Sequence, residues 1–384
     1  MRKQTTPNIS SPSKTTVLQT AHVTKVYGPV QSLAKFISEK KRFDFYQIIH
    51  PLNNNASPES VFLRNGKKIS EVRINTYSIF RYFLDFIITS YWLFKLPKKI
   101  DVGFGMNSFD TLPLVIFRHK INKIVFFNTD FARNRFNNKL INSIYVSIDK
   151  YCAQKADLVC CNTNRTIDAR IDEGINKNKL LLTPNGVDFD KIGKIKPKTK
   201  YSKSLIYVGY LSKEHGLQTV IKELPKLDLK LIVIGSGEYE RKLKNLVKKL
   251  NLDDSVTFLG NLKHQQVINI LKKFGGFGLA PYNNSSEWTY YCDPVKIKEY
   301  LACYVPVIIS SRPEVSETIA REKLGFRYTN EDEIKTILEK VRKMSEKEYK
   351  ETQENISKFR NEFNLNTIYQ NIWQRINQPV YTHE

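Results

Sequence analysis

Two charged residues near the start of one predicted helix, Lys296 and Glu299, have the types and spacing to bind a phosphorylated sugar. They lie in the stretch 292–309, CDPVKIKEYLACYVPVII, where Asp293 can cap a helix and Pro294 fits its first position. A helix N-terminus attracts phosphate through its free N–H groups, and Lys296 adds a full charge. Glu299, one turn further on, can accept hydrogen bonds from sugar hydroxyls. The alternative is a surface Lys–Glu pair on an ordinary helix.

The rest of this stretch predicts how the helix is held in place. Ile297, Tyr300, Leu301 and Tyr304 recur at the spacing of one helix face and predict a buried stripe. The apolar run 305–309 then predicts a short buried strand. Lys296 and Glu299 fall outside the buried stripe, which leaves them available for a ligand.

Glycines follow two other predicted strands of the same half. Gly209 ends one strand, and Gly235 and Gly237 directly follow the next. Such loops expose backbone N–H groups at the carboxyl edge of a parallel sheet and can hold a phosphate, although GSG is also a common strand–helix connector. We therefore expect these glycines to converge with Lys296 and Glu299 on one crevice.

Polar residues and a glycine also follow predicted strands in the first half. His22 ends the first strand, Gly28 makes the turn after it, and Asn107 and Asp130 follow two later strands. In open parallel sheets the ligand crevice lies beyond the carboxyl ends of the strands, so these residues are candidates for the second substrate. The alternatives are that Gly28 only forms a turn, that His22 is packed in the core and that Asp130 caps a helix or turn.

Strand–helix alternation through 384 residues predicts an α/β protein of two domains. We expect a flexible tail over 1–14, a first domain over 15–190, a lysine-rich linker over 191–203 and a second domain over 204–364. A last helix, over 365–376, is apolar enough to dock on another element.

The formal net charge of +23 indicates an anionic partner, which is a phosphorylated ligand, a membrane surface or nucleic acid. Nucleic acid is disfavoured because the chain has no zinc-finger spacing, RNP-like aromatic motif or dense arginine run. The apolar helix predicted over 78–94 has two interpretations. It is a core helix of the first domain, or an aromatic helix at a membrane interface, followed by Lys95, Lys98 and Lys99.

The cysteines and the N-terminus indicate a cytoplasmic protein. Five cysteines, with no CxxC pair, predict reduced thiols and neither disulfides nor a metal site. The first residues are polar and lack the apolar core of a signal peptide.

Six stretches occur together in one order: ADLVCCNT (156–163), TPNGVD (183–188), YVGYLSKEHGLQTVI (207–221), LIVIGSGEYERKL (231–243), VTFLGNL (256–262) and DPVKIKEYLACYVPVII (293–309). Together they resemble the retaining glycosyltransferases of the GT-B group known as family 4. The resemblance implies two Rossmann-like, doubly wound domains facing across a cleft. The second would hold a nucleotide sugar and the first an acceptor, with the C-terminal segment 365–384 completing the first domain.

Four positions depart from the family pattern: the first of its two glutamates is Tyr291, the arginine after VG is Tyr210, the following lysine is His215, and a glycine is Tyr304. The DPxKIKxYLA form resembles a divergent sub-branch. Since two cations that hold the diphosphate are absent, we expect Lys296 to supply that charge, with Lys213 nearby.

The resemblance implies front-face transfer, in which a phosphate oxygen takes the proton of the acceptor and helix dipoles stabilise the leaving diphosphate. We expect Lys296 and Asp130 as catalytic residues. The expected donor-binding residues are Gly209, Lys213, Gly235, Gly237, Asp293, Lys296 and Glu299, and the acceptor side has Gly28, His22 and Asn107. Asp188 and Asp190 match a metal-binding DxD pair but fall at the turn between the domains, so we expect no metal and no other cofactor.

The expected reaction is transfer from a UDP- or GDP-sugar to a glycan or lipid-linked glycan in polysaccharide or glycoconjugate biosynthesis. The charge and the apolar helix fit a peripheral enzyme on the inner face of an anionic membrane. A nucleotide-sugar 2-epimerase of the same fold, or a degenerate GT-B scaffold protein, are the alternatives.

Overall fold

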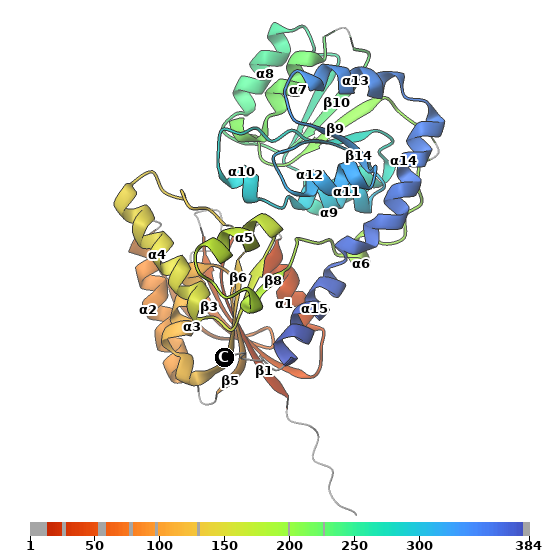
Figure 1. Cartoon of the computed structure of the whole chain (residues 1–384). Coiled ribbons are helices and arrows are strands. Elements are labelled where there is room, and N and C mark those ends of the chain that lie inside the picture. The colour runs from red at the N-terminus through yellow and green to blue at the C-terminus, as the bar shows by residue number, and fades with distance from the viewer. Residues whose placement is uncertain are drawn as a thin grey trace, which may run out of the picture. The chain divides into compact units, whose positions relative to one another are not determined.

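A computed structural model describes residues 14–24, 28–52, 59–76, 80–96, 99–128, 131–198, 200–225 and 227–378. Asp130 therefore lies outside the described residues, as does nearly all of the predicted tail. The described strands form two sheets, one of eight strands and one of six (Figure 1). The α/β architecture with two Rossmann-like domains is confirmed.

The first sheet has the order β4-β3-β2-β1-β5-β6-β7-β8. Its strands are β1 (Thr15–Val23), β2 (Phe43–Pro51), β3 (Glu59–Arg64), β4 (Lys67–Arg73), β5 (Ile100–Gly105), β6 (Ile121–Asn128), β7 (Leu158–Cys161) and β8 (Leu180–Leu182). β1 pairs in parallel with both β2 and β5, whereas β3 and β4 form an antiparallel hairpin at the edge. Asn65 and Gly66 make its two-residue turn, both with positive φ.

The helices of this part of the chain connect the parallel strands. They are α1 (Pro29–Ser38), α2 (Phe80–Lys95), α3 (Ser108–Ile116), α4 (Lys139–Lys155), α5 (Asn164–Asp172) and α6 (Phe189–Ile192), with 3-10 turns η1 (Arg118–Lys120) and η2 (Lys177–Lys179). Asp188 caps α6, since its Oδ1 accepts a hydrogen bond from the backbone of Lys191. That role accounts for the first aspartate of the DxD pair.

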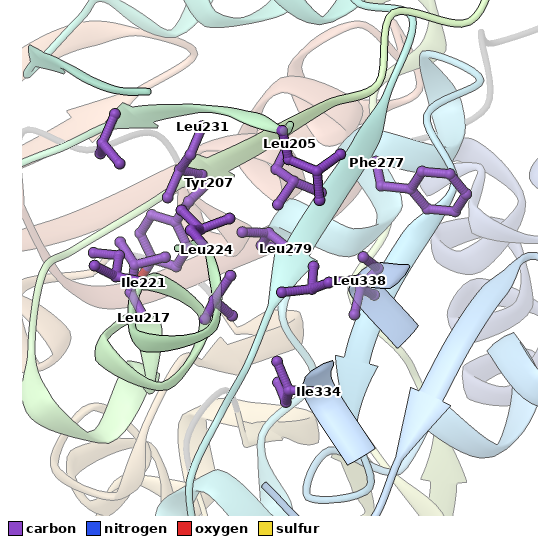
Figure 2. Close-up of a cluster of buried hydrophobic side chains, with 14 of the residues drawn as sticks. Leu205, Tyr207, Leu217, Ile221, Leu224, Leu231, Phe277, Leu279, Ile334 and Leu338 are labelled. Atoms are coloured by element: carbon purple, nitrogen blue, oxygen red, sulfur yellow. The ribbon is translucent and has the colours of Figure 1, made fainter. Parts of the chain in front are cut away.

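The second sheet is parallel throughout, with the order β11-β10-β9-β12-β13-β14. Its strands are β9 (Ser204–Val208), β10 (Lys230–Ile234), β11 (Val256–Gly260), β12 (Phe277–Ala280), β13 (Val307–Ser310) and β14 (Gly325–Tyr328). Figure 2 shows side chains of these strands, including Leu205, Leu231 and Leu279, packed into one buried cluster with Ile334 and Leu338. Such apolar runs are typical of strands buried on both faces.

The helices of this part are α7 (Leu217–Glu223), α8 (Glu240–Lys249), α9 (His264–Lys273), α10 (Trp288–Tyr291), α11 (Val295–Ala302), α12 (Val315–Arg321), α13 (Glu333–Lys343), α14 (Glu346–Phe359) and α15 (Leu365–Asn377), with 3-10 turns η3 (Lys213–His215) and η4 (Arg360–Phe363). Within the described ranges, no helix combines the length and the apolar character needed to cross a membrane.

Contacts divide the chain into two compact units. The first unit takes the residues up to Phe127 together with Tyr151–Leu158, and the second takes Asn128–Lys150 and the chain from Val159 onward. The domain limits expected near 190 and 204 remain predictions. In each sheet the strand order reverses at one place, between β1 and β5 and between β9 and β12, and open α/β sheets bind ligands at such switch points.

Candidate functional site

Two glycine loops lie against one another at the switch point of the second sheet. Gly209 follows β9 with φ of 141° and Gly235 follows β10 with φ of 134°. A Cβ at Gly235 would stand 1.9 Å from the carbonyl oxygen of Gly209. Glycine is therefore required here for both backbone conformation and close approach.

The backbone N–H groups of these glycines are not free for a ligand, contrary to expectation. Gly209 donates to Ile234 O at 2.9 Å, and Gly235 donates to Gly260 O at 2.8 Å, because the strand pairing continues past the named strand ends. Ser236 and Gly237 fit the expected role of binding phosphate through backbone N–H groups better. The N–H groups of Ser236 and Gly237 have no hydrogen-bond partner in the part of the chain that the structure describes.

Lys296 reaches over this loop pair from the first turn of α11. Its Nζ lies 4.2 Å from the ring centroid of Tyr207 and 5.0 Å from that of Tyr282, and a Cβ at Gly209 would be 3.0 Å from it. The Nζ atom is buried and has no hydrogen-bond partner among the described residues. An ammonium group without acceptors in a buried site is costly unless an anion joins it.

The pKa of the Lys296 amine agrees with a site that binds an anion. Burial between the aromatic rings removes water from the amine and lowers its pKa to about 7. A bound diphosphate would favour the charged form and raise this pKa again. His215, which occupies the family's lysine position, is no substitute cation, because burial and the nearby Lys296 lower its pKa to about 3.

Glu299 lies one turn after Lys296 on α11, with its side chain 12% exposed. Its Oε1 lies 2.6 Å from Nε2 of His264, the first residue of α9, and this hydrogen bond raises the pKa of the imidazole. The carboxylate thus already binds a polar group at the place where a ribose hydroxyl was expected. A nucleotide would share this carboxylate with His264 or displace the imidazole.

Asp293 is a structural residue, and neither the helix cap nor the free donor ligand that the sequence predicted. α11 begins one residue later than expected, with Pro294 as its N-cap. The carboxylate of Asp293 forms a buried ion pair with Lys298, and its Oδ2 accepts a hydrogen bond from the backbone of Asn185 at 2.6 Å. Because Lys298 follows Lys296 by two residues, the two lysines point to different sides of the helix.

The predicted buried stripe of α11 is confirmed, since Ile297, Tyr300, Leu301 and Tyr304 are all buried. Tyr304, at the position where the family pattern that the sequence resembles has glycine, has a φ of 61°. It ends the helix in a left-handed cap, with Tyr304 N bonded to Leu301 O. The guanidinium of Arg360 lies 4.4 Å from the centroid of its ring, which helps to hold the strained residue.

Three further predicted residues occupy ordinary structural positions. Lys213 is exposed on the turn η3. Gly28 caps α1 in extended conformation, and its N–H donates to Gln31 Oε1. Asn107 caps α3 through a hydrogen bond from the backbone of Asp110.

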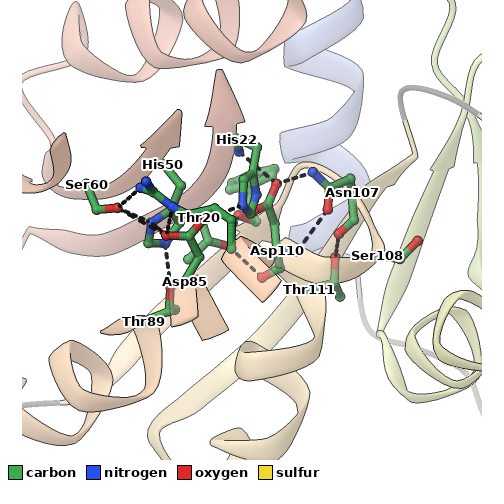
Figure 3. Close-up of polar contacts among 12 residues, drawn as sticks. Thr20, His22, His50, Ser60, Asp85, Thr89, Asn107, Ser108, Asp110 and Thr111 are labelled. Atoms are coloured by element: carbon green, nitrogen blue, oxygen red, sulfur yellow. Dashed lines mark hydrogen bonds and ion pairs between the residues drawn. The ribbon is translucent and has the colours of Figure 1, made fainter. Parts of the chain in front are cut away.

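His22 lies at the switch point of the first sheet, inside a buried polar network (Figure 3). Its Nδ1 is 2.7 Å from Oδ1 of Asp110, and its Nε2 is 3.3 Å from Oδ2 of Asp85. Arg81 donates to the carboxylate of Asp85 at 2.9 Å, and Nδ1 of His50 lies 3.1 Å from Asp85 Oδ1. Each of these side chains is buried.

The charges of this network balance one another. Burial alone would lower the pKa of His22, but the carboxylates of Asp110 and Asp85 outweigh it and raise the pKa to about 9. Burial lowers the pKa of His50, which is therefore neutral. Hydrogen bonds from both histidines hold the pKa of Asp85 below its usual range, against the opposite effect of burial. With Arg81, two cations face two carboxylates, which favours the interpretation of His22 as a packed structural histidine.

The residues that sequence reasoning missed come from distant segments. Tyr207 and Tyr282 flank Lys296 but lie in apolar runs that resemble ordinary core, and His264 is 35 positions from Glu299. One local signal was available. Arg81 and Asp85 are four residues apart on a helix, the spacing of an ion pair.

Residues 188–362 match the family described as Glycosyl transferases group 1. An uncharacterized glycosyltransferase of Methanocaldococcus jannaschii is 28% identical over 288 residues, covering 65% of this chain and 69% of that protein. An N-acetylgalactosamine-N,N'-diacetylbacillosaminyl-diphospho-undecaprenol 4-alpha-N-acetylgalactosaminyltransferase of Campylobacter jejuni is 29% identical over 135 residues, 34% of this chain and 36% of that protein.

Among solved structures, Anabaena HepE in complex with UDP and glucose superposes with a TM-score of 0.72 at 15% identity. The match covers 94% of this chain and 99% of that one. At this identity the likeness establishes the fold, which is shared along nearly the whole chain.

Proposed function

We propose that this chain, whose residues 188–362 match glycosyl transferases group 1 and whose fold is GT-B, transfers a sugar, with retention of configuration, from a UDP- or GDP-sugar to a glycan or lipid-linked glycan. The Campylobacter relative, which acts on a diphospho-undecaprenol substrate by its name, supports a lipid-linked acceptor. The proposed setting is polysaccharide or glycoconjugate assembly at the cytoplasmic face of an anionic membrane, which the net charge of +23 fits.

One observation carries the donor site: the amine of Lys296 is buried beside the glycine loops and has no hydrogen-bond partner among the residues that the structure describes. The diphosphate would bind Lys296 and the N–H groups of Ser236 and Gly237. Glu299 would accept hydrogen bonds from the ribose. These groups lie on elements that meet at the switch point of the second sheet, which supports one continuous donor site.

In the proposed reaction the acceptor hydroxyl attacks the anomeric carbon from the face on which the diphosphate leaves. The bond from that carbon to the phosphate oxygen breaks, a new carbon–oxygen bond forms, and a phosphate oxygen takes the proton of the hydroxyl. Lys296 stabilises the negative charge of the departing diphosphate. Asp130 remains a candidate for orienting a substrate, and the reaction is proposed to need no metal.

Calorimetric titration of the full chain with UDP, GDP, CDP and ADP, with magnesium or with EDTA, tests the donor site. Saturable binding of one nucleotide without magnesium is expected, followed by transfer from the matching sugar to a lipid-linked glycan. Binding that requires magnesium would contradict the metal-free mechanism. Binding without transfer would favour a scaffold protein, and a change of the sugar without acceptor would identify an epimerase.

A further inference from the structure

Helix α2 presents a stripe of apolar side chains outward, and three of its five buried side chains are polar. Its buried residues include Arg81, Asp85 and Thr89. The outward face is a stripe at helical spacing, with exposed fractions from 46% to 68%, formed by Phe80, Phe83, Ile87, Tyr91 and Phe94. We call these five residues the aromatic stripe. This arrangement is the reverse of a surface helix in water.

The polar side chains on the inward face of α2 are held by hydrogen bonds within its unit. Arg81 donates to Asp85, to Ser60 Oγ at 2.8 Å and to Ile74 O at 2.8 Å. Thr89 Oγ1 lies 2.7 Å from Nε2 of His50. The helix is thus fixed to its unit by these polar contacts together with the buried Trp92 and Leu93, whereas the exposed aromatic stripe lies outside that attachment.

Two lysines, Lys95 and Lys120, lie at the C-terminal end of the aromatic stripe, and the exposed Lys99 follows Lys95 by four residues. Lys95 Nζ lies 5.6 Å from the ring centroid of Tyr91, and Lys120 Nζ lies 5.5 Å from that of Phe94. Lys120 also donates to the carbonyl of Phe94 at 2.7 Å, which ties this basic end to the helix. Exposed aromatic side chains beside lysines match the chemistry of a bilayer interface.

We propose that the aromatic stripe lies in the interfacial region of an anionic lipid bilayer, with the basic end at the phosphate headgroups. The competing occupant is a second copy of this chain. A second copy would bring the same basic end and the same net charge of +23, whereas an anionic bilayer complements both. This role of the aromatic stripe rests on the proposed function, because a lipid-linked acceptor lies in a bilayer.

The test is sedimentation of the full chain with vesicles, without donor or acceptor, so that it can fail independently of the proposed reaction. Wild-type protein is expected to bind vesicles that contain phosphatidylglycerol and to bind phosphatidylcholine vesicles much less. Phe83→Ser/Tyr91→Ser should weaken binding by about 100-fold, since removing each buried aromatic side chain costs about tenfold or more. Both residues are 56% exposed, so the fold and the nucleotide affinity should not change.

The matched control is Ile69→Ser/Leu259→Ser, which removes two apolar side chains that are 52% and 41% exposed elsewhere and should leave vesicle binding intact. Lys95→Gln/Lys99→Gln should weaken binding to anionic vesicles by about 30-fold at low salt. The proposal would be overturned if the wild-type protein bound neither kind of vesicle. It would also be overturned if Phe83→Ser/Tyr91→Ser bound anionic vesicles as well as the wild-type protein does. A lipid-free dimer that the same double variant dissociates would assign the stripe to a second copy.

Discussion

The two switch points of this molecule are built from similar polar side chains but differ in what they leave unpaired. At the end of β1, His22 is bound on both ring nitrogens by carboxylates, and the charges of its network balance. At the end of β9, Lys296 has a buried amine without an acceptor among the described residues. The first network is complete in itself, whereas the second lacks an anion.

This difference separates structural polar residues from binding residues better than their residue types do. A histidine at a strand end and a lysine at a helix start both suggest function in the sequence. The complete network needs nothing further, and buried ion pairs of this kind cost much when one partner is removed. The incomplete site gains stability only when a ligand supplies the missing charge.

The largest expected effect is on the complete network. Asp85→Ala should lower the free energy of unfolding by about 3–5 kcal/mol, because it leaves Arg81 buried without its carboxylate and removes one of the two carboxylates that bind His22. Urea unfolding measures this loss. Glu71→Ala is the control, since Glu71 and its partner Lys68 are 48% and 54% exposed and the pair should contribute about 1 kcal/mol or less. A loss at Asp85 no greater than at Glu71 would contradict the structural role.

Lys296→Met should weaken ligand binding without lowering stability, which is the opposite of the effect expected for Asp85→Ala. Nucleotide diphosphate affinity should fall by about 10- to 150-fold, because a charged hydrogen bond contributes about 1.5–3 kcal/mol, and transfer should fall at least as much. Stability should stay equal or rise, since a buried amine is replaced by an apolar side chain of similar size. Calorimetry and urea unfolding on the same variant test both parts. Wild-type affinity in this variant would reject the anion site.

Nucleotide binding should also take up a proton. In the ligand-free protein the pKa of Lys296 is about 7, so at pH 8 the amine is mostly neutral. Bound diphosphate raises the pKa, and binding at pH 8 should therefore take up nearly one proton, with affinity decreasing as the pH rises above 7. Binding enthalpies in HEPES and Tris buffers measure this uptake. Equal enthalpies in the two buffers would contradict it, and Lys296→Met should abolish the difference.

The smallest expected effect is at Glu299. Glu299→Gln should weaken nucleotide affinity by about tenfold or less, because one polar contact to the ribose changes and His264 already shares the carboxylate. The fold should not change. Titration with the nucleotide and with inorganic diphosphate separates the ribose contact, since the diphosphate affinity should be unaffected. An equal loss for both ligands would place Glu299 beside the phosphates.

The sequence was sufficient for the parts of the site that lie on one element. The stripe of α11 and the position of Lys296 follow from helical spacing within a dozen residues. Contacts between segments did not follow, because Tyr207 and Tyr282 look like core residues until the sheet brings them to Lys296. The N–H groups of Gly209 and Gly235 were misjudged because strand pairing extends beyond the apolar runs.

The first unit also has features that were not predicted from the sequence. The hairpin of β3 and β4 has an Asn65-Gly66 turn, which is a hairpin signal that the predictions from sequence did not include. Of the two interpretations of the helix over 78–94, the contacts of α2 with its unit bear on the core helix, and the membrane interface remains a prediction. One face of α2 is buried in the unit and the other is exposed, which neither composition nor hydrophobicity alone could indicate.

The contact between the two glycine loops also limits how this enzyme can vary. Leu211 N donates to Ser236 O and Leu211 O accepts from Tyr239 N, so the loops after β9 and β10 are joined by backbone hydrogen bonds. A Cβ at Gly237 would stand 2.3 Å from Leu211 O, which leaves no room for a slipped register. An insertion or deletion in one loop would displace the other. Exchanging these loops with those of another enzyme should therefore succeed only when both are transplanted as a pair.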